Sequence, residues 1–170
     1  MPSAVIVADT SVLLNFIKID RMDLIGLHPR RFLATDHVEH EIDDVVQRAR
    51  LAAAVAAGHL DTCIVDDPRE VELFLRLAAT HRLGLGECSA IAVARNRGYA
   101  LAIDDNKALN RAFRAVDAAS GSVEIVRTAD VMVGLIRAGV LTVAEADRIK
   151  DDWARRHRFR IKAASFGDLV

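Results

Sequence analysis

Short apolar runs alternate along the chain with longer segments of helical periodicity. Residues 5–8 form a continuous apolar run, as expected of a parallel strand that is buried on both faces. Asp9 follows this run directly, and its side chain can cap a helix over residues 12–19. The pattern predicts a first strand–helix unit with an acid at the carboxyl end of the strand.

Four further strand-like runs follow, separated from one another by helical segments. The expected strands span residues 32–34, 62–65, 99–103 and 123–126. The expected helices span residues 36–58, with a break allowed, and then 68–83, 87–97, 107–116, 129–138 and 143–157. Five strands interleaved with helices predict an α/β fold, a doubly wound three-layer α/β/α sandwich with a central parallel sheet. Residues 1–157 would form this single domain, and residues 158–170 a basic C-terminal tail.

Composition and charge exclude several classes of protein. Of the 170 residues, 52% are hydrophobic and 28% charged, which excludes an intrinsically disordered chain. The net charge of −1 excludes a generally cationic binder but leaves room for a local basic patch. Cys63 and Cys88 lack zinc-site spacing, so we expect buried, reduced thiols. No run of about 20 apolar residues occurs, so we expect a soluble, cytoplasmic protein that makes no membrane contact.

Acidic residues follow two of the expected strands. Asp9 ends the first strand, and Asp104 and Asp105 end the fourth. Each can be explained as a helix cap, but a cap needs only one acid, and two adjacent carboxylates repel each other. Ligands of a doubly wound sheet bind outside the carboxyl ends of its strands. These acids are therefore candidate functional residues.

Two more candidate acids lie on helices. Glu87 begins a helix that is apolar on nearly all sides, which leaves its side chain facing a cleft or an internal partner; a favourable interaction with the helix dipole is the alternative. In the helix after the second strand, Glu39 stands three residues after Asp36 and fits a capping box with it. This leaves Glu41 as the freer ligand, with a solvated charge at the rim of a buried face as its alternative.

The acids suggest more together than singly. If they converge, three or four negative charges share one pocket and repel each other. A hard divalent cation removes this penalty, and Mg²⁺ and Mn²⁺ take carboxylate and water oxygens. Such an ion can activate a water for in-line attack on a phosphodiester and stabilise the leaving oxygen. The pattern therefore indicates a metal-dependent hydrolase.

Four segments resemble, in the same order, the motifs of the PIN-domain ribonucleases, whose best-known members are the VapC-type toxins of toxin–antitoxin pairs. The segments are VADTSVLLNF at residues 7–16, VEHEI at 38–42, LGECSAIAVA at 85–94 and AIDDNKA at 102–108. The resemblance implies a PIN-like fold, an RNA substrate and Mg²⁺ or Mn²⁺ as cofactor. For the narrower toxin role it also implies an antitoxin protein as partner.

By motif position, the resemblance also implies roles for individual residues. Asp9, Glu41, Glu87 and one of Asp104 and Asp105 would be the metal ligands and catalytic acids, and Asp105 is favoured because the family's acid commonly precedes a polar or basic residue that opens the next helix. The hydroxyl of Thr10 or Ser11 would hold a metal-bound water. Asn15 matches a polar position of the first motif, with a hydrogen bond to the helix backbone as the alternative.

A basic segment near the C-terminus offers a surface for a polyanion. Residues 155–162 contain five cations and no acid, with Trp153 and Phe159 close in sequence. Aromatic side chains among arginines suit single-stranded RNA through stacking and phosphate contacts. A positive helix end followed by a loose tail is the alternative. The arginines that we expect to contact RNA are Arg111, Arg114, Arg155, Arg156 and Arg158.

Two other functions fit parts of the pattern. A receiver-type phosphoacceptor domain also carries acids at strand ends, and Asp66 and Asp67 follow the third expected strand, but such a domain needs an acidic pair where this chain has only Asp9. A non-catalytic PIN-like module that binds RNA or protein would keep all the acids. The apolar helices at residues 68–83 and 129–141 could supply a homodimer or antitoxin-binding face, although intramolecular core is the simpler account.

Overall fold

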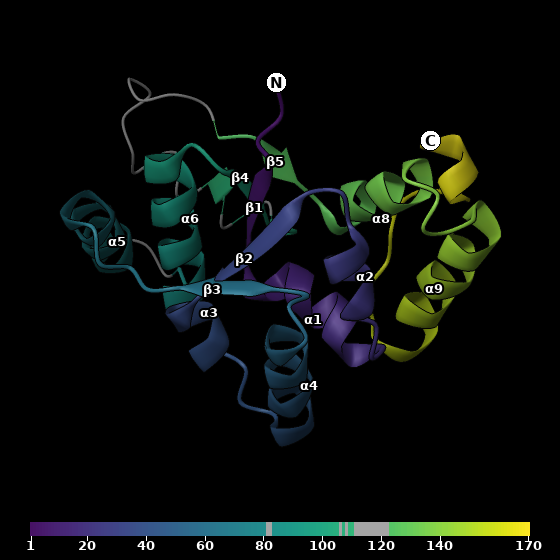
Figure 1. The fold of residues 1–170 in the computed structure, drawn as a ribbon, viewed down its shortest axis with the longest axis horizontal. Coiled ribbons are helices and arrows are strands. Elements are labelled where there is room, and N and C mark those ends of the chain that lie inside the picture. Colours follow the sequence, from purple (N-terminus) through teal and green to yellow (C-terminus); the bar gives the residue numbers. More distant parts are fainter. Residues whose placement is uncertain (81–82, 106, 108, 111–122) are drawn as a thin grey trace.

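A five-stranded parallel sheet forms the centre of the protein. Figure 1 shows the computed structural model, which describes residues 1–80, 83–105, 107, 109–110 and 123–170. The strands are β1 (Val5–Ala8), β2 (Arg31–Thr35), β3 (Asp61–Cys63), β4 (Ala100–Ala102) and β5 (Ile125–Val126). All neighbouring pairs are parallel, in the order β3-β2-β1-β4-β5. The predicted α/β architecture is therefore confirmed.

Helices cover both faces of this sheet. In the described part of the chain they are α1 (Thr10–Lys18), α2 (Asp23–Leu27), α3 (Asp36–His40), α4 (Val45–Ala56), α5 (Pro68–Thr80), α6 (Leu85–Arg97), α8 (Thr128–Arg137) and α9 (Val143–Arg156), with the 3₁₀ helix η1 at Phe166–Asp168. Figure 1 shows α5 and α6 on one side of the sheet and α2, α8 and α9 on the other. Helix α6 packs on β1, β2 and β4, and α4 packs against α1.

The strand order reverses at β1, which positions the candidate site. The chain runs from β1 outward to β2 and β3, and then returns to place β4 and β5 on the other side of β1. Val7 pairs with Leu33 of β2 and with Leu101 of β4. Because the strands are parallel, the carboxyl ends of β1, β2 and β4 meet at one edge of the sheet. Ligands of doubly wound folds bind at this type of reversal.

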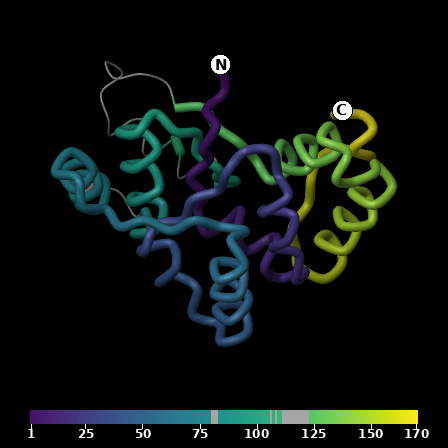
Figure 2. Tube along the Cα trace, viewed as in Figure 1, coloured from purple at the N-terminus to yellow at the C-terminus, as the bar shows by residue number. Residues whose placement is uncertain are grey.

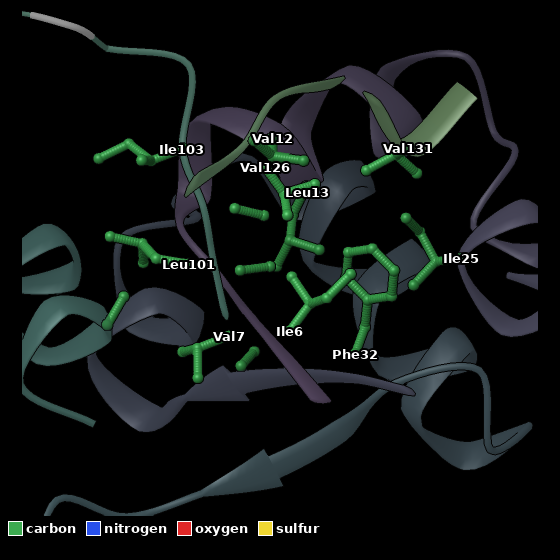
Figure 3. Close-up of a cluster of buried hydrophobic side chains, with 14 of the residues drawn as sticks. Ile6, Val7, Val12, Leu13, Ile25, Phe32, Leu101, Ile103, Val126 and Val131 are labelled. Carbon is green, nitrogen blue, oxygen red and sulfur yellow. The ribbon is translucent and has the colours of Figure 1, made fainter. Parts of the chain in front are cut away.

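The core is built from the apolar runs that the sequence pattern identified. Figure 3 shows Ile6 and Phe32 of the strands on the side of Leu13 and Val131 from the covering helices, with Leu101 on the opposite face of the sheet. Each of these five residues is at most 2% exposed. The buried strands therefore carry continuous apolar sequence, as parallel strands covered on both faces require.

Several element boundaries differ from the prediction. The helix expected at residues 36–58, for which a break was allowed, is divided into α3 and α4, because Asp44 begins a new helix by accepting a hydrogen bond from the backbone N of Gln47 (2.9 Å). Helix α2 was not predicted, since five residues are too few to show a periodicity. The helix expected at residues 107–116 lies largely outside the described residues.

The segment after α9, which we expected to be a basic tail, packs onto the rest of the protein. Figure 2 shows it returning alongside α9 to η1. Phe166 is fully buried, and Asp147 of α9 accepts hydrogen bonds from Ser165 Oγ (2.6 Å) and Phe166 N (2.8 Å). The C-terminal residues therefore contribute to the hydrophobic core. Among the described residues, no helix is both long and apolar enough to cross a membrane.

Candidate functional site

Asp9 lies at the carboxyl end of β1, where it caps α1. Its Oδ2 accepts hydrogen bonds from Ser11 N (3.1 Å) and Ser11 Oγ (2.6 Å). Its Oδ1 is buried and has no hydrogen-bond partner within the described part of the chain. Burial raises the pKa of Asp9; the bonds from Ser11 oppose this effect, and the charge of Glu41 adds to it. Asp9 is thus a helix cap, and one of its carboxylate oxygens accepts no hydrogen bond from the residues that the structure describes.

Helix α3 places Glu41, although not for the reason given by the sequence pattern. Thr35, not Asp36, caps this helix, by accepting a hydrogen bond from Val38 N (3.2 Å). The predicted capping box between Asp36 and Glu39 is therefore wrong, because the helix begins one residue earlier than the box requires. Glu41 follows the last residue of α3 as its C-cap.

The carboxylate of Glu41 lies against the start of α6. Its Oε1 accepts a hydrogen bond from Gly86 N (2.7 Å), and its Oε2 accepts one from Thr10 Oγ1 (2.7 Å). A Cβ atom at Gly84 would lie 2.7 Å from Glu41 Oε1, and one at Gly86 would lie closer still. The two glycines therefore allow Glu41 to approach the backbone at the helix start, which side chains there would prevent.

Glu87, in the first turn of α6, is the third acid at this edge of the sheet. Its Oε2 accepts a hydrogen bond from Gly84 N (2.9 Å). Burial raises the pKa of Glu87; the bond from Gly84 opposes this shift, and the charges of Asp9, Asp105 and Glu41 add to it. Among the described residues, no ion pair joins Asp9, Glu41 or Glu87 to a cation. No arginine or lysine in the described part of the chain therefore neutralises their negative charges.

Asp104 and Asp105, which the sequence could not separate, have different surroundings. Both oxygens of Asp104 accept hydrogen bonds, Oδ1 from Thr128 N (3.0 Å), and Oδ2 from Thr128 Oγ1 (2.6 Å) and Asn15 Nδ2 (3.0 Å). Asp105 Oδ1 accepts a hydrogen bond from Lys107 N (2.8 Å). Of these two acids, Asp105 is the one whose charge contributes to the raised pKa of Glu87.

The sequence analysis missed a set of hydroxyl groups that joins the elements of the site. Thr35 Oγ1 and Ser89 Oγ are 2.6 Å apart and fully buried, and Ser89 Oγ donates to Gly86 O (2.8 Å). Thr128, which bonds to Asp104, is also fully buried. Each of these residues lies at a strand end or in the first turns of a helix, which marks it only as a cap. A hydroxyl partner from a distant segment leaves no sequence pattern.

The donor atoms at this edge fit a hard divalent cation in their chemistry. Asp9, Glu41, Glu87 and Asp105 offer only oxygen, which Mg²⁺ and Mn²⁺ prefer. Asp9 Oδ1 is buried without a donor from the described residues, and a cation would satisfy it. In this structure the acids are held by hydrogen bonds to the protein. Among the described residues, no three His, Cys, Asp or Glu side chains lie close enough together to hold an ion. Binding would therefore exchange some of these hydrogen bonds for coordination.

The basic segment is exposed, but one of its aromatic neighbours is not. Trp153 is fully buried against Phe16 and Phe159, so the expectation that Trp153 could stack on RNA is wrong. Arg156 pairs with Asp152 on the surface of α9 (2.5 Å). The side chains of Arg155, Arg156 and Arg158 are exposed. Arg111 and Arg114 lie outside the described residues.

The residues that a receiver domain would phosphorylate lie away from this edge. Asp66 and Asp67 follow β3, which is an edge strand separated from β1 by β2. Both are exposed, and Asp67 Oδ1 accepts a hydrogen bond from Arg69 N (2.8 Å), as a residue ahead of a helix commonly does. These two acids therefore do not join the cluster of Asp9.

Comparison with known proteins agrees with the fold and the resemblance. The family model described as a PIN domain matches residues 5–166, which include every acid of the site and the segment after α9 as far as Phe166. No curated protein matches the sequence significantly. The family match and the parallel sheet together confirm the predicted family, and the chain belongs to the PIN-domain family.

Proposed function

We propose that this protein is a divalent-metal-dependent ribonuclease that hydrolyses RNA phosphodiester bonds at the cluster of Asp9, Glu41, Glu87 and Asp105. The observation that carries the proposal is the buried Oδ1 of Asp9, which has no hydrogen-bond donor among the described residues. A buried carboxylate oxygen without a donor is costly, and neighbouring acids increase that cost. A divalent cation would remove both penalties, and PIN domains have a nuclease fold.

Asp9, Glu87 and Asp105 would hold Mg²⁺ or Mn²⁺, with Glu41 completing the set of acids. The ion would supply an activated water and stabilise the leaving oxygen of the phosphodiester. Ser11 occupies Oδ2 of Asp9 and so leaves Oδ1 for the ion. Thr10 orients the carboxylate of Glu41. Either hydroxyl would also position the attacking water.

We extend the proposal to the way in which RNA is held. Arg155, Arg156 and Arg158 are exposed on a segment that Phe159 fixes to the protein through its contact with Trp153. A fixed, exposed row of guanidinium groups can contact successive phosphates at a lower entropic cost than a loose tail. These three arginines would bind the RNA backbone and would carry no base specificity.

A role as the toxin of a toxin–antitoxin pair is the narrower form of the same proposal. It requires a surface for an antitoxin, and a homodimer requires one for a second copy. Helices α3 and α4 border a groove lined by Glu39, His40, Leu51 and Val55, and Val45 at the start of α4 is 80% exposed. Exposed apolar side chains beside the acidic cluster support a protein partner at this place.

Cleavage of a panel of structured and unstructured RNAs, with Mn²⁺ and with chelator, tests the proposal. Wild type should cleave only with the ion, and Asp9→Asn should not cleave. Asp66→Asn removes an exposed acid after another strand and is the matched control that should cleave normally. RNA binding without cleavage would instead indicate a non-catalytic module. Labelling of Asp66 or Asp67 by acetyl phosphate would indicate a receiver-type function.

A further inference from the structure

Three side chains from distant segments form a closed set of hydrogen bonds behind the acidic cluster. Asn15 Nδ2 donates to Asp104 Oδ2 and to Thr128 Oγ1, both at 3.0 Å. Thr128 Oγ1 donates to the same oxygen of Asp104 (2.6 Å), and Thr128 N donates to the other (3.0 Å). Asn15 is 6% exposed and Thr128 is fully buried. The set ties α1 to the carboxyl end of β4 and the start of α8.

These bonds occupy the carboxylate of Asp104. Within the described part of the chain, its two oxygens accept three hydrogen bonds, and all three donors belong to Asn15 and Thr128. Hydrogen bonds to an ionised acceptor are stronger than bonds between neutral groups. Both oxygens of Asp104 already accept hydrogen bonds inside the protein, whereas Asp9 Oδ1 accepts none among the described residues.

The backbone of Asp104 connects this set to the acidic cluster. Asp104 N donates to Ser11 Oγ (3.3 Å), and Ser11 Oγ donates in turn to Asp9 Oδ2 (2.6 Å). Asp105 is the next residue along the chain. Asp104 is therefore linked to Asp9 through the hydroxyl of Ser11, and its backbone leads directly into Asp105.

The same set receives support from the C-terminal helix. Trp153 Nε1 donates to Asn15 O (2.7 Å), and the Trp153 ring packs edge-on against Phe16 with centroids 5.6 Å apart. Helix α9 thereby holds α1 at the residue that bonds to Asp104.

We propose that Asp104 is a positioning residue and not a metal ligand, and that Asn15, Thr128 and Trp153 act with it to hold Asp9 and Asp105 in place. The inference rests on the proposed nuclease function, because it assigns a role in the same site. Residues that orient metal ligands typically contribute about 10–100-fold in metal affinity or activity.

An exchange of side chains tests this assignment. In Asp104→Asn alone, the new amide nitrogen would face the donors of Asn15 and Thr128, so we expect a lower Tm without metal and a loss of cleavage of about 10–100-fold. The double variant Asn15→Asp/Asp104→Asn restores the hydrogen bonds with the donor and acceptor exchanged between positions 15 and 104. The amide at position 104 donates to position 15 and to Thr128, and the hydroxyl of Thr128 turns to donate to position 15.

The double variant should therefore recover most of the metal-free Tm, the Mn²⁺-induced rise in Tm and the cleavage rate. Asp105→Asn, the matched single variant, should keep its metal-free Tm but lose the Mn²⁺-induced rise. A folded double variant that lacks both the Mn²⁺-induced rise and cleavage would show that Asp104 acts through its own charge at the ion, and would overturn the proposal.

Thr128→Val gives a second test that leaves every acid in place. It removes one hydroxyl and should reduce both the Mn²⁺-induced rise in Tm and cleavage. Thr128→Ser keeps the hydroxyl and should lose much less of either. Unchanged activity in Thr128→Val would also overturn the proposal. If wild type neither cleaves RNA nor responds to Mn²⁺, the proposed function itself has failed. If wild type cleaves RNA but the folded double variant does not, the proposed function stands and only the role assigned to Asp104 has failed.

Discussion

Thr35 donates a hydrogen bond to Ser89 in the buried layer between β2 and α6 (2.6 Å). The direction follows from the other bonds, because the single hydroxyl proton of Ser89 goes to Gly86 O and Thr35 Oγ1 already accepts from Val38 N. This bond joins the residue that caps α3 to helix α6. The two helices place Glu41 and Glu87, so the bond contributes to the spacing of two acids that it does not touch.

Ser89→Ala should therefore affect both stability and activity. The substitution leaves the buried hydroxyl of Thr35 without its acceptor, and we expect a loss of about 1–3 kcal/mol in the free energy of unfolding. Urea denaturation measures this loss. Cleavage per folded molecule should also fall, since α3 can shift against α6. Ser89→Thr is a poor control, because it keeps the hydroxyl but adds a methyl group to a packed site. Ser89→Cys is closer in size to serine and is the better comparison. Wild-type stability in Ser89→Ala would contradict the assigned direction.

Gly86→Ala should disable the site with little change elsewhere. The added Cβ would overlap the carboxylate of Glu41, which must then leave its bond to Gly86 N. We expect weaker Mn²⁺ binding and slower RNA cleavage, measured by thermal shift and by gel assay. Gly98→Ala is the control, because no described residue lies within 4 Å of a Cβ at that position, although its φ of +67° makes an alanine there strained. If Gly86→Ala binds Mn²⁺ normally, Glu41 does not contribute to the ion site.

Stability without metal should depend on pH through Asp9. Burial raises its pKa, so the folded protein holds this proton more tightly than the unfolded chain does. Asp9 therefore contributes stability below its ordinary pKa, and this contribution is lost as the pH rises through the raised value. Asp9→Asn carries no charge and keeps an oxygen for the helix cap. Its Tm should match or exceed that of wild type at pH 7 in chelator.

Addition of Mn²⁺ should reverse this order. The ion binds the ionised carboxylate, so the Tm of wild type should rise with Mn²⁺, and the rise should be larger at pH 7 than at pH 4. The Tm of Asp9→Asn should change little at either pH. A wild type whose response to Mn²⁺ is equal at both pH values would argue against coordination by Asp9.

The ion pair between Arg97 and Glu70 gives a prediction about the fold alone. Arg97 Nε and Nη2 donate to Glu70 (2.6 and 2.9 Å), which is 1% exposed and joins α5 to α6. Arg97→Ala leaves a buried, unpaired carboxylate, and we expect a loss of about 3–5 kcal/mol in the free energy of unfolding. Arg76→Ala breaks an exposed pair with Glu72 and should cost about 0–1 kcal/mol. Equal losses in the two variants would contradict this account.

The sequence predicted the strands and the acids at their ends because both depend on local pattern. A parallel strand covered on both faces must be apolar throughout, as Val5–Ala8 is, and the residue after it lies at the edge of the sheet. Glu87 was identified because it begins a helix that is otherwise apolar. These features are visible without knowing which segments become neighbours.

The remaining features depend on contacts between distant segments. Asp36 fits a capping box by spacing, but Thr35 has the extended backbone that a cap requires and takes the role instead. Asp104 and Asp105 are alike in sequence, and only their neighbours, Asn15 and Thr128 on one side and the cluster of Asp9 on the other, tell them apart. The sequence places Trp153 beside the arginines, but its ring is fully buried and does not face the solvent.

Arg158 occupies a backbone conformation that suits glycine, with a φ of +55°. For a residue with a Cβ atom, this left-handed conformation costs roughly 1–2 kcal/mol. Glycine would adopt this conformation freely, so the arginine side chain is present at a position where the backbone conformation favours glycine. A programme of stabilising substitutions would replace this arginine early, and the more stable protein would then lack one of the three arginines that we propose to contact RNA.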